Sequence, residues 1–347
     1  MSWVKPEHSR KEIDRAGKAF VDPTTPLAEK VAARAVINNW RSSHAFPLNT
    51  LRMSLRRKVN QVNPNALVAQ RSKRIQSIRM KLERFPNMKL SQMHDLGGAR
   101  AVLASVEEVR TVERSFLNGQ HKHVLARHDD YIAAPQATGY RGVHLVYKYK
   151  SDKSSTYNDL RIEIQLRSQL MHAWATAVET IGTFTKQSLK SNRGSDDFLR
   201  FFALMSAAFA HDEGESGPPE VPSSIEEINS EIRALASQLR VVERMEAYRV
   251  GLRETERPDV GGAYTLLQLD IENSLLTING YDSLPEATAA FDAVESLSSS
   301  SAVEDELMFD AVLVSVGSIN SLRAAYPNYF LDTTLFLDRL YEIVSTE

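Results

Sequence analysis

Two acidic residues, Asp95 and Glu163, lie next to or within predicted strands. Asp95 shortly precedes a predicted strand at 99–103, and Glu163 lies in another, between Ile162 and Ile164. Because side chains alternate across a strand, Glu163 lies on its polar face, with Arg161, Gln165 and Arg167. That strand alone is equally compatible with a solvated face. If Asp95 meets Glu163 across the sheet, the two carboxylates could hold Mg²⁺ together with water and substrate phosphates.

A basic segment precedes these strands. Residues 65–85 read as one helix, which Asn65 caps. Arg74, Ser77 and Lys81 are spaced by three and four residues, so they share a helix face. Such a face could grip a triphosphate, although a basic amphipathic helix can also simply face solvent. The candidate phosphate contacts are Arg71, Lys73, Ser77, Lys81 and, beyond the helix, Arg100.

The loop before the strand at 142–150 contains residues that a plain turn does not need. Gly139 allows a tight turn, and an exposed Tyr140 could stack on a base. Arg141 and His144 could then contact phosphate or sugar. The alternative is a tyrosine in the core beside a structural turn.

The elements that must position these residues alternate between helix and strand. We predict helices within 26–85, a strand at 99–103, a helix at 106–116, strands at 121–132, 142–150 and 159–167, and a helix from Ser168. This alternation predicts an α/β (α+β) fold with a mixed sheet flanked by helices.

Composition divides the chain further. We predict an N-terminal helical extension at 1–40, a main domain at 41–210, a linker at 211–222, a long helix at 223–258 and a small acidic α+β domain at 259–347. Within the last, 263–281 reads as a hairpin, 308–316 as a strand, and 284–295, 319–330 and 332–344 as helices.

Charge is distributed unevenly along the 347 residues, although the formal net charge is only −2. Residues 211–347 carry eight arginines, no lysine and 26 acidic residues, a net charge of −18 that leaves +16 for residues 1–210. The first part is therefore expected to bind anions. The absence of cysteine excludes disulfides and thiolate zinc sites. We find no signal-peptide core or membrane-spanning run and expect a soluble, cytoplasmic protein without a membrane partner.

Four segments together resemble the synthetase domain of the RelA/SpoT family over about residues 40–210. They are "QRSKRIQSIRMKL", "HDLGGARAVL", "DDYIAAPQATGYRGVHLVYKY" and "IEIQLRSQLMHAWA". The resemblance implies a nucleotidyltransferase-like fold and transfer of the β,γ-pyrophosphate of ATP to a ribose 3′-hydroxyl. The implied acceptor is GDP or GTP, and the product is the alarmone (p)ppGpp.

The same resemblance implies residue roles. Asp95 and Glu163 would bind Mg²⁺, and Glu163 would activate the 3′-hydroxyl. ATP would be bound by Arg71, Lys73, Ser77, Lys81 and Arg100. The acceptor would be bound by Tyr140, which stacks on its base, and by Arg141, His144, Gln165 and Arg167.

Departures from the family pattern concentrate on the acceptor side, at Asp129, Gln136 and Thr138. Two of them remove positive charge where the acceptor's 5′-phosphates would lie. One alternative is therefore a toxin that pyrophosphorylates the 3′-terminal adenosine of tRNA, a polyanion suited to Arg52, Arg56, Arg57 and Lys58. Another is a catalytically silent nucleotide-binding module, against which the presence of both carboxylates argues.

The acidic C-terminal part carries no zinc-ligand set. Its charge suggests that it docks on the basic part and restrains it, as an antitoxin restrains a toxin, or that a separate activator or antitoxin protein binds. A packing or dimerisation domain is the alternative.

Overall fold

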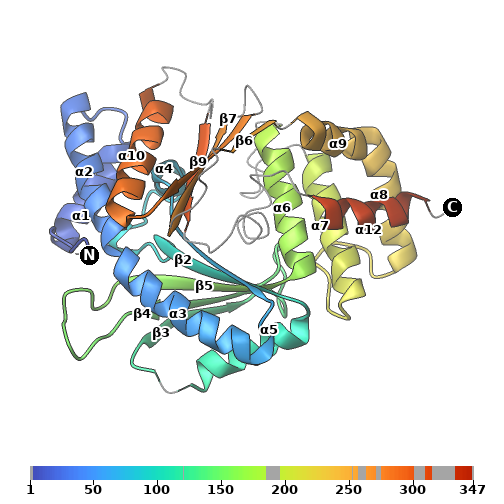
Figure 1. The fold of residues 1–347 in the computed structure, drawn as a ribbon. Helices are drawn as coiled ribbons and strands as arrows, with labels where there is room; N and C mark the ends of the chain where they lie inside the picture. The colour runs from blue at the N-terminus through green and yellow to red at the C-terminus, as the bar shows by residue number, and fades with distance from the viewer. Residues whose placement is uncertain are drawn as a thin grey trace.

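The computed structural model describes residues 3–119, 121–184, 196–251, 253–256, 263–270, 275–300, 309–314 and 333–345. Within these residues the strands form one nine-stranded mixed sheet of order β3-β4-β5-β2-β1-β9-β7-β8-β6 (Figure 1). The strands are β1 (Leu67–Ser72), β2 (Gly97–Leu103), β3 (Val124–Asp130), β4 (Val143–Lys148), β5 (Arg161–Ser168), β6 (Arg253–Glu256), β7 (Tyr264–Asp270), β8 (Leu275–Tyr281) and β9 (Phe309–Val314). The predicted class, a mixed sheet flanked by helices, is confirmed.

The middle of the sheet is built around a parallel pair. β2 and β5 run parallel, while β1 and β4 flank them in antiparallel orientation. On one face lie α3 (Ala45–Val62) and α5 (Val106–Leu117). Leu51 and Leu55 of α3 are buried there in one cluster with Ile162 and Ile164 of β5. Since Glu163 alternates with these isoleucines, its side chain belongs to the opposite face.

The N-terminal helices form a second core. α1 (Arg10–Val21), α2 (Leu27–Ser43) and α4 (Ile75–Arg84) bury Ile13, Ile37 and Ile78 together. A short 3-10 helix, η1 (Leu90–Gln92), lies between α4 and β2.

The prediction of one helix over 65–85 is wrong. Its first part is β1, which pairs with β2 from Leu67↔Val102 to Ser72↔Gly97, and only its second part is α4. Asn65 caps no helix, because the strand β1 follows it; its backbone N–H donates to the Asn63 side chain. Pairing with β2 satisfies the backbone and buries Val68, so tertiary contacts override the local helix pattern.

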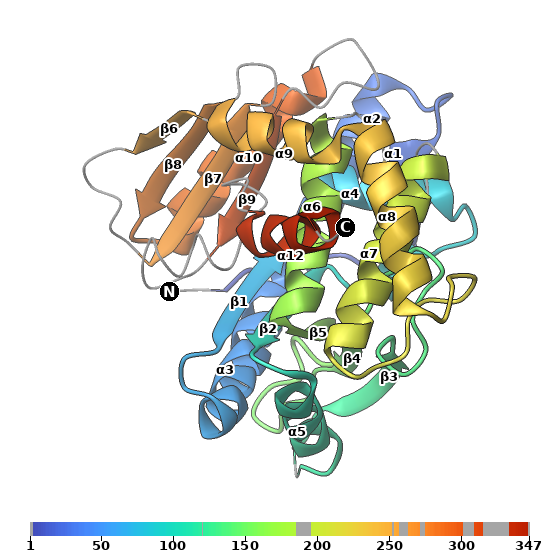
Figure 2. The ribbon, with the colours of Figure 1, turned by 90° about the vertical axis from the view of Figure 1, so that its right-hand side faces the viewer.

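A helical layer stands beside the sheet (Figure 2). It contains α6 (Gln169–Phe184), α7 (Asp196–Asp212), α8 (Ile225–Leu239), α9 (Val241–Gly251) and α12 (Thr334–Ser345). The helix predicted over 223–258 is interrupted at Arg240, which adopts a left-handed conformation between α8 and α9 (φ 51°), and 253–256 form β6. Phe336 and Leu340 of α12 are buried against Phe202 and Phe209 of α7. The C-terminal helix therefore belongs to this layer.

The remaining C-terminal elements continue the sheet. The hairpin predicted at 263–281 is β7 and β8, and the predicted helix at 284–295 lies within α10 (Leu284–Ser300). β9 joins this part to β1 through the pair Arg71↔Val314. The helix predicted at 319–330 lies outside the described residues. Among the described helices, none is long and apolar enough to cross a membrane.

Candidate active site

A pocket open to solvent lies over β2 and β5, on the face of the sheet opposite α3. It is lined by Ala69, Gln70, Arg71, Lys73, Asp95, Gly98, Ala99, Arg100, Glu163 and Gln165. Gly98 is the register partner of Glu163, and a Cβ built on Gly98 meets nothing within 4 Å. The missing side chain therefore leaves the space beside Glu163 free.

Asp95 is held by two lysines at the entrance to β2. Lys73 Nζ donates to Asp95 Oδ2 at 2.8 Å, and Lys81 Nζ donates to Oδ1 at 3.0 Å. Burial alone would raise the pKa of Asp95, but the charges and hydrogen bonds of the two lysines outweigh burial and hold that pKa well below its usual range. Asp95 is therefore ionised at neutral pH.

Glu163 has a protein partner on each carboxylate oxygen. His144 Nδ1 lies 3.1 Å from Oε1, and Gln165 Nε2 donates to Oε2 at 2.7 Å. Burial and the negative charge of Asp95 raise the pKa of Glu163, but its contacts with His144 and Gln165 leave the pKa below its usual value. Two carboxylates 68 positions apart in sequence thus line one pocket and interact electrostatically.

The donor set of this pocket fits a hard cation. Within the described chain, no group of three or more His, Cys, Asp and Glu side chains forms a metal site. Asp95 and Glu163, which both line the pocket, would supply two oxygen ligands to a bound Mg²⁺, and water and phosphate would supply the others. Each carboxylate oxygen already accepts one hydrogen bond and retains a second lone pair for a metal.

Three of the five predicted phosphate contacts line the pocket, and two do not. Arg71, Lys73 and Arg100 line the pocket from β1, the following loop and β2. Lys81 reaches the site through its bond to Asp95. Ser77 lies one turn before Lys81 on α4, outside the residues that line the pocket.

The expectation of an exposed Tyr140 ring is wrong. Tyr140 is 9% exposed and packs edge-on against Tyr131, His144 and Trp174. The guanidinium of Arg167 lies over its ring, 5.1 Å from the centroid. The loop can bury the ring because Gly139 and Gly142 adopt positive φ angles of 93° and 147°.

The hydroxyl of Tyr140 is also engaged. It lies 2.5 Å from His144 Nε2 and accepts from Arg167 Nη2 at 3.1 Å. Burial would raise the pKa of Tyr140, but Arg167 and His144 lower it to about 7. For His144, burial lowers the pKa, while Tyr140 and Glu163 raise it to about 9.

Arg141, which the sequence predicts to contact phosphate or sugar, is buried outside the pocket. Arg141 is 2% exposed, and its Nη1 lies 2.7 Å from Oε2 of Glu213, just beyond α7. It does not line the pocket. The guanidinium instead ties the loop to the helical layer, where Ser206 also donates to the Gly139 carbonyl.

Four residues that the sequence does not predict as site residues also line the pocket: Ala69, Gln70, Gly98 and Ala99. Glycines 97 and 98, at the start of a strand, were the available signal for Gly98, since a strand glycine often marks a close approach. Ala69 and Gln70 carry no such signal, because the sequence pattern of their segment predicts a helix where the structure has β1.

Residues 70–187 match the family model described as "Region found in RelA / SpoT proteins". The resemblance to the RelA/SpoT family found in the sequence is therefore confirmed over this part of the chain.

Two curated relatives match the same part of the chain. GTP pyrophosphokinase YjbM of Bacillus subtilis (strain 168) is 31% identical over 116 residues, which cover 33% of this chain and 54% of that protein. GTP pyrophosphokinase of Haemophilus influenzae is 30% identical over 118 residues, which cover 34% of this chain and 14% of that protein. The chain thus spans about half of the first relative and much less of the second.

A solved structure, the small alarmone synthetase 2 of Bacillus subtilis, is 22% identical to this chain with a TM-score of 0.42. The match covers 50% of this chain and 91% of that one.

Proposed function

We propose that this chain is a nucleotide pyrophosphokinase that transfers the β,γ-pyrophosphate of ATP to the ribose 3′-hydroxyl of GDP or GTP. The observation that carries the proposal is the pocket in which Asp95 and Glu163 lie together with Arg71, Lys73 and Arg100. The names of the two curated relatives, both GTP pyrophosphokinases, support the reaction and the guanine acceptor.

The pocket supplies what phosphoryl-type transfer needs, which is charge neutralisation and alignment. Arg71 and Arg100 offer planar forks to the triphosphate, and Lys73 offers a point charge. Glu163, kept ionised by its neighbours, is suited to accept the proton of the 3′-hydroxyl. Mg²⁺ held by Asp95 and Glu163 would neutralise phosphate charge when bound.

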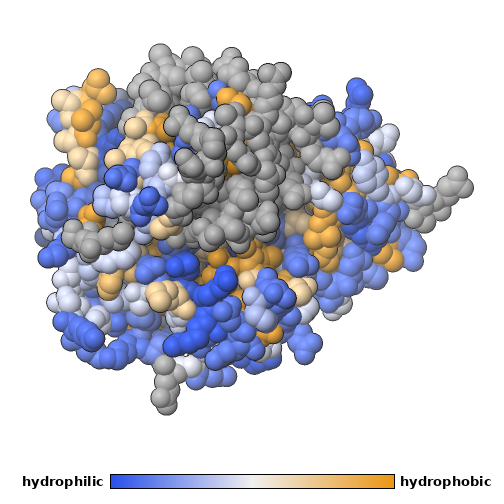
Figure 3. All heavy atoms as spheres, in the orientation of Figure 1, coloured by the Kyte–Doolittle hydropathy of each residue, from blue (hydrophilic) through white to orange (hydrophobic). Residues whose placement is uncertain are grey.

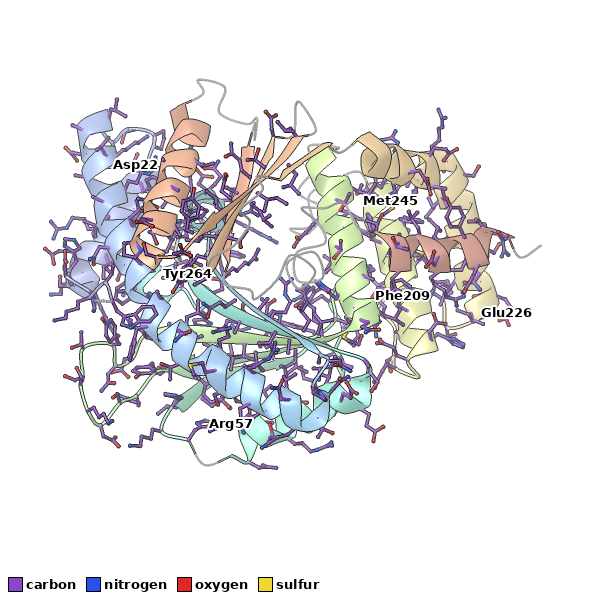
Figure 4. The ribbon with its side chains drawn as sticks, in the orientation of Figure 1. Asp22, Arg57, Phe209, Glu226, Met245 and Tyr264 are labelled. Carbon is purple, nitrogen blue, oxygen red and sulfur yellow. The ribbon has the colours of Figure 1, made fainter. Side chains whose placement is uncertain are left out.

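The position of the basic helix favours guanine nucleotides over tRNA as acceptor. Arg56 and Arg57 are exposed on α3, in a largely hydrophilic part of the surface (Figures 3 and 4). α3 covers the face of the sheet opposite the pocket, so these cations do not line the path to Glu163. Asp129, one of the departures from the family pattern on the acceptor side, forms an ion pair with Arg127, whose Nε lies 2.6 Å from Asp129 Oδ2.

We propose further that the C-terminal part restrains the pocket through β1. β9 pairs with β1 at Arg71, a residue that lines the pocket. Arg41, at the end of α2, donates to Asp292 of α10 at 2.7 Å and to the Lys73 carbonyl at 3.5 Å. Truncation of the C-terminal part would also remove α12, which is part of the helical core. A point substitution at Asp292 therefore tests the proposed restraint better than truncation does.

The test of the main proposal is transfer of label from γ-³²P-ATP. The full chain is incubated with Mg²⁺ and GDP, GTP, ATP or bulk tRNA in separate reactions. Glu163→Gln is the inactive control. Glu83→Gln, the same change at an exposed glutamate paired with Arg79 on α4, is the matched control and should keep wild-type activity.

The outcomes separate the alternatives. Label in guanine nucleotides that Glu163→Gln abolishes supports the proposal. Label in tRNA alone would replace it with the toxin reaction. ATP binding without label in any acceptor would favour the silent binding module.

A further inference from the structure

A second cleft, here called the α2/α10 cleft, lies between the N-terminal helices and the C-terminal part of the sheet (Figure 1). α10 and β9 form one wall, and the N-terminal segment, the end of α2 and the start of α3 form the other. The cleft shares no lining residue with the pocket that contains Glu163. Its two walls come from opposite ends of the chain and are brought together by the fold.

The lining of the α2/α10 cleft is mostly apolar. Trp3 and Val4 contribute to one wall, and Phe291 and Leu313 contribute to the other. Concave sites with apolar and aromatic walls and a few polar groups are typical of small-molecule binding sites. The cleft therefore has the surface chemistry of a site for a small organic molecule.

One face of α10 leaves the room for such a molecule. Pro285, Thr288, Ala289 and Asp292 line the cleft at the spacing of a single helix face. The first three have short side chains. Asp292 crosses to the other wall, where it accepts from Arg41 Nη2 at 2.7 Å.

The charges in the cleft are paired with each other. Among the described residues that line it, Arg41 and Asp292 are the charged ones, and they form an ion pair. Arg41 is 2% exposed, and its guanidinium lies over the Phe291 ring, 5.2 Å from the centroid. An ion would lose its hydration without gaining an opposite net charge, so the cleft suits a neutral molecule. Hydroxyl groups of Ser42 and Ser72 can offer it hydrogen bonds.

The cleft and the active-site pocket lie on two sides of one short segment. Arg71 and Lys73 line the pocket, and Ser72 between them lines the cleft, as expected where side chains alternate at the end of β1. Arg41 also donates to the Lys73 carbonyl at 3.5 Å, and Lys73 Nζ donates to Asp95 at 2.8 Å. A molecule in the cleft would therefore contact the segment that carries two of the proposed phosphate contacts.

We propose that the α2/α10 cleft binds a neutral, largely apolar small molecule with a hydrogen-bonding group, and that the bound molecule weakens the binding of ATP. A molecule that fits the cleft binds the present arrangement of its two walls and so stabilises that arrangement. In this arrangement Arg41 and β9 hold the end of β1, so binding strengthens the restraint proposed above for the C-terminal part. The effect on ATP rests on the proposed function, whereas binding in the cleft does not.

Fluorescence titration of the full chain with N-phenyl-1-naphthylamine tests the site. This probe is neutral and has apolar rings and one N–H group. We expect saturable binding of one probe molecule per chain. Ala289→Phe fills the cleft from an exposed position on α10 and should weaken binding by at least about tenfold. Ala293→Phe, the same change at an exposed alanine one turn later and outside the lining, is the matched control and should bind as the wild type does.

Three outcomes of the titration would overturn the proposal. They are no saturable binding to the wild type, equal affinity for the wild type and Ala289→Phe, and an equal loss of affinity in both alanine variants. Trp3→Ala removes part of the opposite wall and should also weaken binding of the probe, so the site remains testable if Ala289→Phe does not fold.

Isothermal titration calorimetry with a non-hydrolysable ATP analogue tests the coupling without turnover. Saturating probe should lower the affinity of the wild type for the analogue by about fivefold or more, and should not change that of Ala289→Phe. Coupling is reciprocal, so the analogue should weaken probe binding by the same factor. An unchanged affinity for the analogue would overturn the coupling. If the wild type labels no acceptor, the proposed function fails, and the probe titration still decides whether the cleft is a binding site.

Discussion

Replacing Asp95 with asparagine keeps the shape of the side chain and removes its charge. Lys73 and Lys81 then lose an ionised acceptor at 2.8 and 3.0 Å. A hydrogen bond to a charged group is worth about 1.5–3 kcal/mol. Phosphate oxygens of ATP can take over as the acceptor. Recovering half of one such bond, at the upper end of this range, is about 1.4 kcal/mol, so we expect Asp95→Asn to bind metal-free ATP up to about tenfold more tightly than the wild type.

The same substitution should abolish pyrophosphate transfer, because one of the two proposed Mg²⁺ ligands is lost. Tighter binding of ATP together with no turnover is an unusual combination for a site variant. It follows here because Asp95 competes with phosphate for the two lysines.

Stability should change in a pH-dependent way. The pKa of Asp95 is lowered in the folded protein, so its stabilising contribution is present above the unfolded value of about 3.9 and is lost as the pH falls through the folded value. Side-chain exposures of 21% for Asp95 and 15% for Lys73 make this a mostly buried pair. We expect Asp95→Asn to lower the free energy of unfolding by about 3 kcal/mol at pH 7, and by less as the pH falls below 3.9.

Isothermal titration calorimetry with ATP and EDTA measures the binding, and urea unfolding measures the stability. Asp152→Asn is the control, since Asp152 pairs with Lys122 at the surface with exposures of 69% and 64% and should change stability by less than about 1 kcal/mol. A folded Asp95→Asn protein that binds metal-free ATP no better than the wild type would refute the reasoning, because the lysines would then not face the phosphates.

Three further predictions test other parts of the structure. Gly98→Leu fills the open space beside Glu163, so the affinity for a non-hydrolysable ATP analogue should fall by at least about tenfold, with little change in the midpoint of thermal unfolding. Unchanged affinity would mean that ATP binds elsewhere. Glu213→Gln removes the nearest counter-charge of the buried Arg141 guanidinium and leaves the more distant Glu215 and Asp212, so urea unfolding should show a loss of up to about 3 kcal/mol while the acceptor KM stays unchanged; a raised KM with normal stability would instead indicate that Arg141 contacts the acceptor. Asp292→Asn removes the ion pair with Arg41 and should raise the rate of labelling if the C-terminal part restrains the pocket; an unchanged rate would leave it a packing role.

The strand of Glu163 was readable from sequence because alternation is a local property. Ile162 and Ile164 had to be buried, so Glu163 had to face the other way, and the structure agrees. The segment at 67–72 was not readable, because its strand conformation depends on pairing with β2, about 30 residues later. Helix-like spacing of Arg74, Ser77 and Lys81 was correct for α4 and was extended too far toward the N-terminus.

Tyr140 and Arg141 show a second limit of sequence reasoning. A loop with glycine, tyrosine, arginine and histidine has the composition of a binding loop, and half-exposed loops usually carry such roles. Here the partners that bury the loop, Trp174 and Glu213, come from distant segments that form the helical layer. No local pattern links them to the loop, so the sequence leaves a buried and an exposed Tyr140 as open alternatives.

Net charge was a poor guide to where anions bind, although it gave the correct sign. The surplus of +16 in residues 1–210 includes Arg56 and Arg57, which lie behind the sheet. The cations that meet the pocket are few, and the sheet brings them there: Arg71 from β1, Lys73 from the loop after it and Arg100 from β2. Lys73 and Lys81 both pair with Asp95, whose single negative charge offsets only one of their two positive charges. The charge available to a phosphate therefore depends on whether a metal ion or a phosphate competes for these groups. How this pocket binds ATP therefore depends less on the overall charge of the domain than on the local arrangement of β1, the loop after it and β2 around Asp95.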